Sequence, residues 1–112
     1  MTETPTLDPA DPIDAVLLEI HELIRRKRAD YAVDGHPFSN FYAVARRVSH
    51  LGIGPMGVLE VLLAVKEERL IALAVNGRDP ANESVDDTYL DKTVYAVLQR
   101  ALALRLGQEA TP

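Results

Sequence analysis

Residues 83–98, with the sequence ESVDDTYLDKTVYAVL, decide the fold predicted for this chain. At about 100° per residue in a helix, most of their aliphatic side chains fall on one stripe together with Ala101. This periodicity indicates an amphipathic α-helix that begins near residue 83. The same stripe also contains Glu83, Asp87 and Asp91, which are spaced four residues apart. Because an unpaired carboxylate is costly to bury, these side chains need a cation or basic side chains as compensation.

The beginning of this helix also has a purely structural explanation. Acidic side chains are favoured in the first turn of a helix, where they interact with unpaired N–H groups and the helix dipole. Ser84, followed three residues later by Asp87, is typical of a capping box. Neither effect explains Asp91, which lies two turns into the helix. A metal or ligand site and a structural start signal are therefore both open explanations for Glu83 and Asp87.

A first helix is predicted from the pair Asp11-Pro12, an N-cap followed by proline at the first helical position, and from the stripe of aliphatic side chains that follows. Lys27 and Tyr31 fall on the same stripe, so we expect Lys27 to point inward. The other basic residues of the segment 25–28 are explained as a solvated helix end that complements the helix dipole.

Two more helices are predicted between the first helix and the acidic one. The shorter begins at Ser39 as its cap and ends at Gly52, with Phe41 on its apolar stripe. The longer begins at Pro55 and ends at Asn76-Gly77, because these residue types favour the left-handed conformation that closes a helix. Much of it is apolar on nearly every side, as expected for a helix that packs against several partners.

The polar residues of this longer helix form two groups. Glu60 and Glu67 share one stripe with a small residue, whereas Lys66 and Arg69 project from a different side. Charge pairing between residues three or four positions apart explains such a group without any function, and this is the interpretation we prefer for Glu68.

Composition limits the functions that the chain can serve. A chain of 112 residues with 47% hydrophobic residues suits one helical domain, predicted at 11–106 between flexible tails at 1–10 and 107–112. The net charge of −5 argues against stable binding of duplex nucleic acid. The absence of cysteine excludes disulfides and thiolate metal sites. Since no apolar run reaches membrane-spanning length and no cleavage signal occurs, we expect a cytoplasmic protein.

Five short motifs, in this order, resemble the MazG-like all-α nucleoside-triphosphate pyrophosphohydrolases, including the phage nucleotide-modification-associated branch. They are Lys27-x-x-Asp30-Tyr31, Phe38-Ser-Asn-Phe41, Lys66-x-x-Arg69, Glu83-x-x-x-Asp87-x-x-x-Asp91 and Tyr95-Ala96, and they cover roughly residues 27–98. The resemblance implies an all-α, four-helix MazG-like bundle that is completed by homo-oligomerisation. It also implies Mg²⁺-dependent hydrolysis of a (d)NTP to monophosphate and pyrophosphate.

The resemblance further implies roles for individual side chains. Carboxylates on two adjacent helices would hold Mg²⁺, or Mn²⁺ in its place, a cation that prefers oxygen ligands shared with substrate phosphates. The implied metal ligands are Glu60, Glu67, Glu83, Asp87 and Asp91, of which the last three are also the implied catalytic residues. Lys27, Lys66 and Arg69 would bind phosphate, and Tyr31 or Phe41 would stack on a base. An aromatic side chain is, however, more often simply part of the core.

The chain departs from the usual signature of that superfamily, which is EExxE on one helix and ExxD on the next. Glu67 and Glu68 match the first two positions, but Ile71 occupies the third acidic position, and residues 83–86 match ExxD. Three hypotheses follow: an active hydrolase, a catalytically inactive nucleotide-binding or base-modification accessory protein, and a helical module that engages a host protein. In each case we expect a homodimer or a homotetramer, because the third helix is apolar on more sides than three neighbours can cover.

Overall fold

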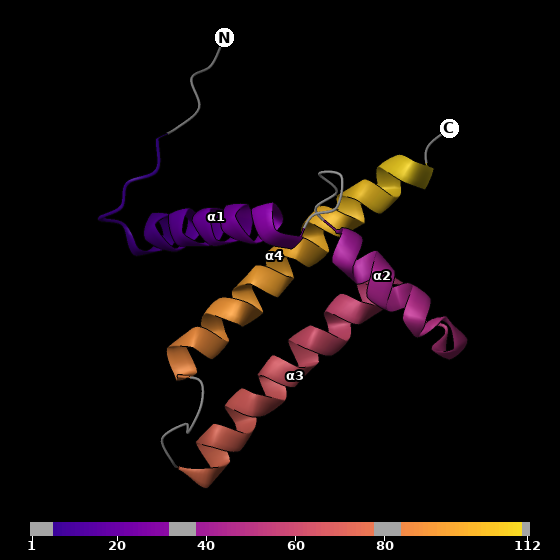
Figure 1. Ribbon diagram of the computed structural model, residues 1–112. Helices are drawn as coiled ribbons and strands as arrows, with labels where there is room; N and C mark the ends of the chain where they lie inside the picture. Colours follow the sequence, from indigo (N-terminus) through magenta and orange to yellow (C-terminus); the bar gives the residue numbers. More distant parts are fainter. Residues whose placement is uncertain (1–5, 32–37, 78–83, 111–112) are drawn as a thin grey trace.

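The computed structural model describes residues 6–31, 38–77 and 84–110, and within these ranges the chain is all-α (Figure 1). The elements are α1 (Pro12–Tyr31), α2 (Ser39–Arg47), the 3-10 turn η1 (Ser49–Leu51), α3 (Pro55–Asn76) and α4 (Val85–Ala110). No strand occurs in these described ranges. The predicted all-α class is therefore confirmed.

Helices α3 and α4 form an antiparallel pair, which is the most extensive contact between two elements (Figure 1). Helix α2 packs against the N-terminal part of α3, and the core lies at this junction. Its buried members are Phe38, Leu59 and Leu102, and Phe41 is among the half-buried side chains packed around them. The largest cluster of buried side chains therefore lies toward one end of the α3–α4 pair.

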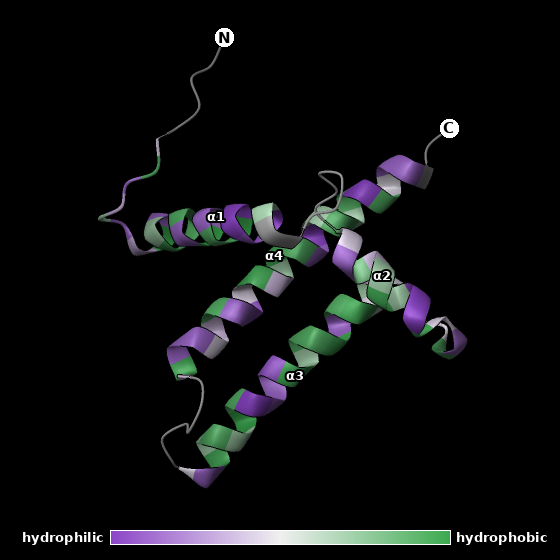
Figure 2. Cartoon of the chain, in the orientation of Figure 1, coloured by the Kyte–Doolittle hydropathy of each residue, from purple (hydrophilic) through white to green (hydrophobic). Residues whose placement is uncertain are grey.

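Helix α1 packs mainly on α4, and only part of its apolar stripe is covered. Ile20 is buried, whereas Ile13 is 72% exposed and Leu17 is also exposed. Figure 1 shows the N-terminal part of α1 extending to the side of α4 that faces away from α3. The hydropathy colouring of Figure 2 shows apolar positions along α1, α3 and α4 alike.

The predicted helix ends agree with the structure at the start of α1 and at both ends of α3, which begins at Pro55. The carboxylate of Asp11 accepts hydrogen bonds from the backbone N–H groups of Ile13 and Asp14, at 2.9 and 3.1 Å, so Asp11 caps α1. Gly77 adopts a left-handed conformation with φ of 61° and closes α3. Each end is fixed by a local interaction, which is why the sequence pattern located it.

Three other helix ends differ from the prediction. The cap of α2 is Phe38 rather than Ser39, and Phe38 makes no side-chain capping hydrogen bond. Helix α2 ends at Arg47, and η1 occupies the remaining positions before Gly52. Helix α4 continues beyond Leu106, where an ion pair of 3.1 Å between Arg105 and Glu109 supports its last turns.

Candidate functional site at the polar seam

Four side chains meet between α3 and α4 near the N-terminal end of α4, and we call this group the polar seam. It consists of Lys66 and Arg69 from α3 with Thr88 and Asp91 from α4. Each helix contributes two residues that are three positions apart and therefore share one face. Because the helices are antiparallel, Lys66 lies opposite Asp91 and Arg69 lies opposite Thr88.

Asp91 forms an ion pair with Lys66 across the seam. The distance between Lys66 Nζ and Asp91 Oδ2 is 2.9 Å, and the two side chains are 19% and 28% exposed. The expectation that the charge of Asp91 is compensated is confirmed. The compensating group in the structure is a basic side chain, the ammonium of Lys66. The pair is partly withdrawn from water, so its two charges interact more strongly than an exposed pair would.

Thr88 is the buried polar residue of the seam. Its side chain is completely buried, and its hydroxyl donates a hydrogen bond of 3.0 Å to the backbone carbonyl of Ser84. The same hydroxyl accepts a hydrogen bond of 3.2 Å from Nε of Arg69. Sequence reasoning missed Thr88, although its spacing from Asp91 matches the spacing of Lys66 from Arg69 and could have indicated two facing pairs.

The other acidic residues at the start of α4 lie in its first turn. The hydroxyl of Ser84 accepts a hydrogen bond of 2.9 Å from the backbone N–H of Asp87, which confirms the predicted cap. The side chains of Asp86 and Asp87 are exposed. Glu83 lies outside the described residues. Ser84 thus caps the start of α4 through the backbone of Asp87. The carboxylate of Asp87 remains accessible, one turn before Asp91.

Of the two predicted metal ligands on α3, Glu60 lies apart from Asp91. Glu60 is exposed and accepts a hydrogen bond of 2.6 Å from the amide of Gln99, eight residues beyond Asp91 on α4. That separation corresponds to about 12 Å along the helix. Glu67 is exposed on α3. Among the described residues, no three acidic or histidine side chains are grouped so that they could hold a metal ion.

Asp87 and Asp91 are the described carboxylates that best fit a magnesium ion. They lie one turn apart on α4, so both side chains project from neighbouring positions on the same side of the helix. Magnesium is commonly held by one or two carboxylates, with water and substrate phosphates as its remaining ligands. A two-carboxylate site is therefore compatible with the residues present.

The three predicted substrate-binding residues outside the seam have different settings. Lys27 is exposed, so the expectation that it points inward is wrong. The contact of α1 with α4 covers Ile20, and a lysine ammonium retains its hydration when its helix is only partly covered. Phe41 packs against the core. Tyr31 is the last residue of α1, and its side chain lies outside the described residues.

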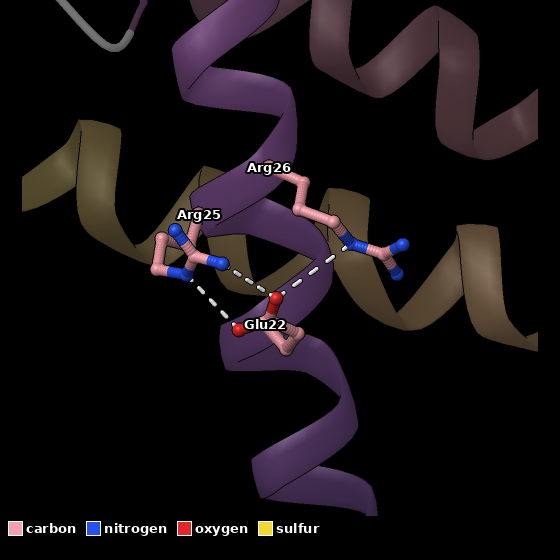
Figure 3. A network of polar contacts seen from close by, with 3 residues as sticks. All are labelled: Glu22, Arg25 and Arg26. Atoms are coloured by element: carbon pink, nitrogen blue, oxygen red, sulfur yellow. Dashed lines mark hydrogen bonds and ion pairs between the residues drawn. The ribbon is translucent and has the colours of Figure 1, made fainter.

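A second polar network lies on the exposed surface of α1 (Figure 3). The carboxylate of Glu22 accepts two hydrogen bonds from Arg25, at 2.7 and 3.0 Å, and lies 3.8 Å from Arg26. The hydrogen bonds from Arg25 lower the pKa of Glu22 below its ordinary value. All three residues belong to one helix and are exposed, so this network stabilises α1 locally without joining it to another element.

No family model, curated protein or solved structure matches this chain. None of the described helices combines the length and the apolar character that a membrane span requires.

Proposed function

We propose that this protein is a Mg²⁺-dependent, MazG-like pyrophosphohydrolase of the phage nucleotide-modification-associated type, which cleaves a (d)NTP to monophosphate and pyrophosphate. The observation that best supports the proposal is the composition of the polar seam. Lys66 and Arg69 of α3 meet α4 within one turn of Asp87 and Asp91. A triphosphate needs cationic partners and its magnesium needs carboxylate oxygens, and the seam offers both kinds of group.

The seam residues and two further carboxylates have distinct roles in this proposal. Lys66 and Arg69 bind substrate phosphates, while Asp87 and Asp91 would hold the metal together with Glu83. The metal would neutralise phosphate charge and activate a water molecule. In the protein without substrate, the ammonium of Lys66 compensates Asp91. Thr88 orients Arg69 through its hydroxyl and is a positioning residue.

A second candidate is a nucleotide-binding protein without hydrolytic activity, and two observations favour it. The carboxylate of Asp91 already has a cationic partner in Lys66. Ile71 occupies the position where the superfamily signature has its third acidic residue, and its side chain is exposed. Lys66 neutralises Asp91, and Ile71 supplies no carboxylate, so the site attracts a metal ion less strongly. Such a protein would still bind phosphate through Lys66 and Arg69 without hydrolysing the nucleotide.

Pyrophosphate release from a panel of NTPs and dNTPs, measured on the purified chain with Mg²⁺ and with a chelator, tests the first candidate. We expect turnover with Mg²⁺ and none with the chelator. Binding of a nucleotide without turnover would support the second candidate. Absence of both binding and turnover across the panel would contradict both.

Two neighbouring carboxylates provide a matched pair of variants for this assay. Asp86 and Asp87 are both exposed in the first turn of α4, so their replacement by Asn changes the helix dipole interaction equally. They point in directions about 100° apart, and Asp87 is the one on the side of Asp91. We expect Asp87→Asn to abolish turnover and Asp86→Asn to retain it. Loss of turnover in Asp86→Asn alone would instead indicate that Glu83 and Asp86, which match the ExxD signature, hold the metal.

We also propose that the chain assembles as a homodimer or homotetramer. Aliphatic side chains exposed on α3, among them Val61 and Val65, support this proposal. It does not depend on whether the protein is catalytically active.

A further inference from the structure

The side of α3 that faces away from α4 carries an apolar stripe that the described elements leave uncovered. We call it the outer stripe, and its apolar members are Val61, Ala64, Val65, Ile71, Ala72 and Val75, all of them exposed. Val65 is 58% exposed and Val75 is 79% exposed. Since these residues recur at spacings of three and four, they occupy a sector about 120° wide along the helix.

The opposite side of α3 carries the residues that are buried within the chain or that contact α4. Leu59 is fully buried and Val58 nearly so, and Lys66 and Arg69 bind the residues of α4. An ordinary surface helix exposes charged residues on its far side. The outer stripe contains Glu68 as its single charged residue. Helix α3 is therefore built to pack on both sides.

The dimensions of the chain indicate how much surface is left to cover. Its accessible surface is 8334 Å², whereas a compact protein of its mass exposes about 6,100 Å². The difference is roughly 2,200 Å², and a stable interface needs only about 800 Å² from each partner. The radius of gyration of 16.6 Å likewise exceeds the value of about 13 Å expected for a compact domain of this length. The smallest extent is 24 Å, which corresponds to about two layers of helices.

We propose that the outer stripe is the interface with a second copy of this chain, and that α3 packs antiparallel against α3 of that copy across a twofold axis near Val61–Val65. A twofold interface brings the same patch of both copies together, and an apolar helical stripe can pack against itself. Ala64 lies beside the proposed axis, where a small side chain lets two helices approach closely. The inference specifies the homo-oligomer proposed above and is independent of hydrolysis.

Glu68 determines both the direction of packing and the position of the axis. In a parallel pair each residue faces its own counterpart, so the two Glu68 carboxylates would be forced together. An antiparallel pair with its axis at Glu68 would have the same defect. With the axis at Val65, the two carboxylates are separated by about 9 Å along the helices. The repulsion between two like charges is weaker at that spacing than at contact, because it falls with distance and is screened by salt.

The mass of the full-length chain in solution, measured by light scattering at micromolar concentration, tests the interface. We expect at least twice the chain mass of 12.3 kDa. Val65→Lys should reduce the mass to half or less of that value, because it buries two ammonium groups beside the axis. Leu104→Lys, at a position on α4 that is 51% exposed, is the matched control and should leave the mass unchanged. A single-chain mass for the unmodified protein, an unchanged mass for Val65→Lys, or dissociation of Leu104→Lys would overturn the proposal.

Cysteine cross-linking provides a second measurement that tolerates a poorly folding lysine variant. The chain contains no cysteine, so a single introduced thiol can form a disulfide only with another copy. Val65→Cys should cross-link under mild oxidation, since residues beside the axis come within disulfide range. Val75→Cys is more exposed but lies far from the axis, and it should not cross-link. Equal cross-linking at both positions, or cross-linking at Val75→Cys alone, would overturn the antiparallel arrangement.

Discussion

Two ion pairs of similar chemistry occupy different regions of this molecule, and the difference shows which charges organise the fold. The Lys66–Asp91 pair joins α3 to α4, and its side chains are 19% and 28% exposed. The Glu22–Arg25 pair lies within α1, and its side chains are 49% and 63% exposed. An exposed pair within one helix contributes little to stability, whereas removing one partner of a buried pair leaves an uncompensated charge.

The pair between helices also has a geometric effect that the pair in α1 lacks. Together with the Arg69–Thr88 hydrogen bond, it fixes how far α3 is shifted along α4. A slip by one turn would break both interactions at once and would bury unpaired polar groups. The pair in α1 constrains only the turn to which it belongs.

Among the variants proposed here, the one that removes the charge of Asp91 should change the free energy of unfolding most. We expect Asp91→Asn to reduce the free energy of unfolding by about 2 kcal/mol without metal, between the values for exposed and for fully buried pairs. Thermal and urea unfolding in the presence of a chelator measure the change. An unchanged or higher stability would mean that carboxylate repulsion, and not the pair with Lys66, dominates at this position.

The response of the same variant to magnesium separates a structural role of Asp91 from a catalytic one. A cation that binds only the folded protein raises its stability by mass action. We expect Mg²⁺ to raise the melting temperature of the unmodified protein, and to do so less in Asp91→Asn. If the variant is destabilised and its response to the metal is unchanged, the proposed hydrolytic site is wrong.

Thr88→Val should have the next largest effect, because it retains the shape of the side chain but removes the hydroxyl. The Nε donor of Arg69 then loses this acceptor, at a cost of about 1–2 kcal/mol. Thr88→Ser retains the hydroxyl and serves as the control, with a smaller loss that reflects only the missing methyl group. Urea unfolding of both variants gives the comparison. Equal losses would show that packing, and not the hydrogen bond, accounts for Thr88.

Gln99→Ala should have a smaller effect. The hydrogen bond from Gln99 to Glu60 also joins α3 to α4, but Glu60 is exposed and can be hydrated when its partner is removed. We expect a loss of about 0.5 kcal/mol in urea unfolding. A loss as large as that of Asp91→Asn would show that the whole length of the contact, and not the polar seam alone, fixes the register.

Glu22→Gln should have the smallest effect, and its sign depends on pH. Arg25 lowers the pKa of Glu22 in the folded protein, so the carboxylate stabilises the fold above its ordinary pKa. That contribution is lost as the pH falls through the lowered value. We therefore expect the variant to be slightly less stable than the unmodified protein at neutral pH and equally stable once the pH is well below the lowered pKa of Glu22. A difference that persists at acidic pH would contradict a role of the charge.

Local signals in the sequence located most of the helices. Asp11 and Ser84 begin their helices and Gly77 closes one, because each acts through hydrogen bonds or backbone conformation within a few residues. The spacing of Lys66 and Arg69 on a side of α3 away from Glu67 was also evident from helical periodicity alone. The cap of α2 was not, since Phe38 holds that position by packing into the core and makes no capping hydrogen bond.

The sequence by itself determined that this chain is helical, that Asp91 needs a partner, and that α3 is apolar on more than one side. Only the tertiary structure decided that Lys66 is that partner, that Thr88 is buried against Arg69, and that Lys27 is exposed. The physical reason is that periodicity specifies the direction of a side chain on its own helix. The partner that it meets depends on the register and crossing of two helices, which are set by packing between residues far apart in the chain.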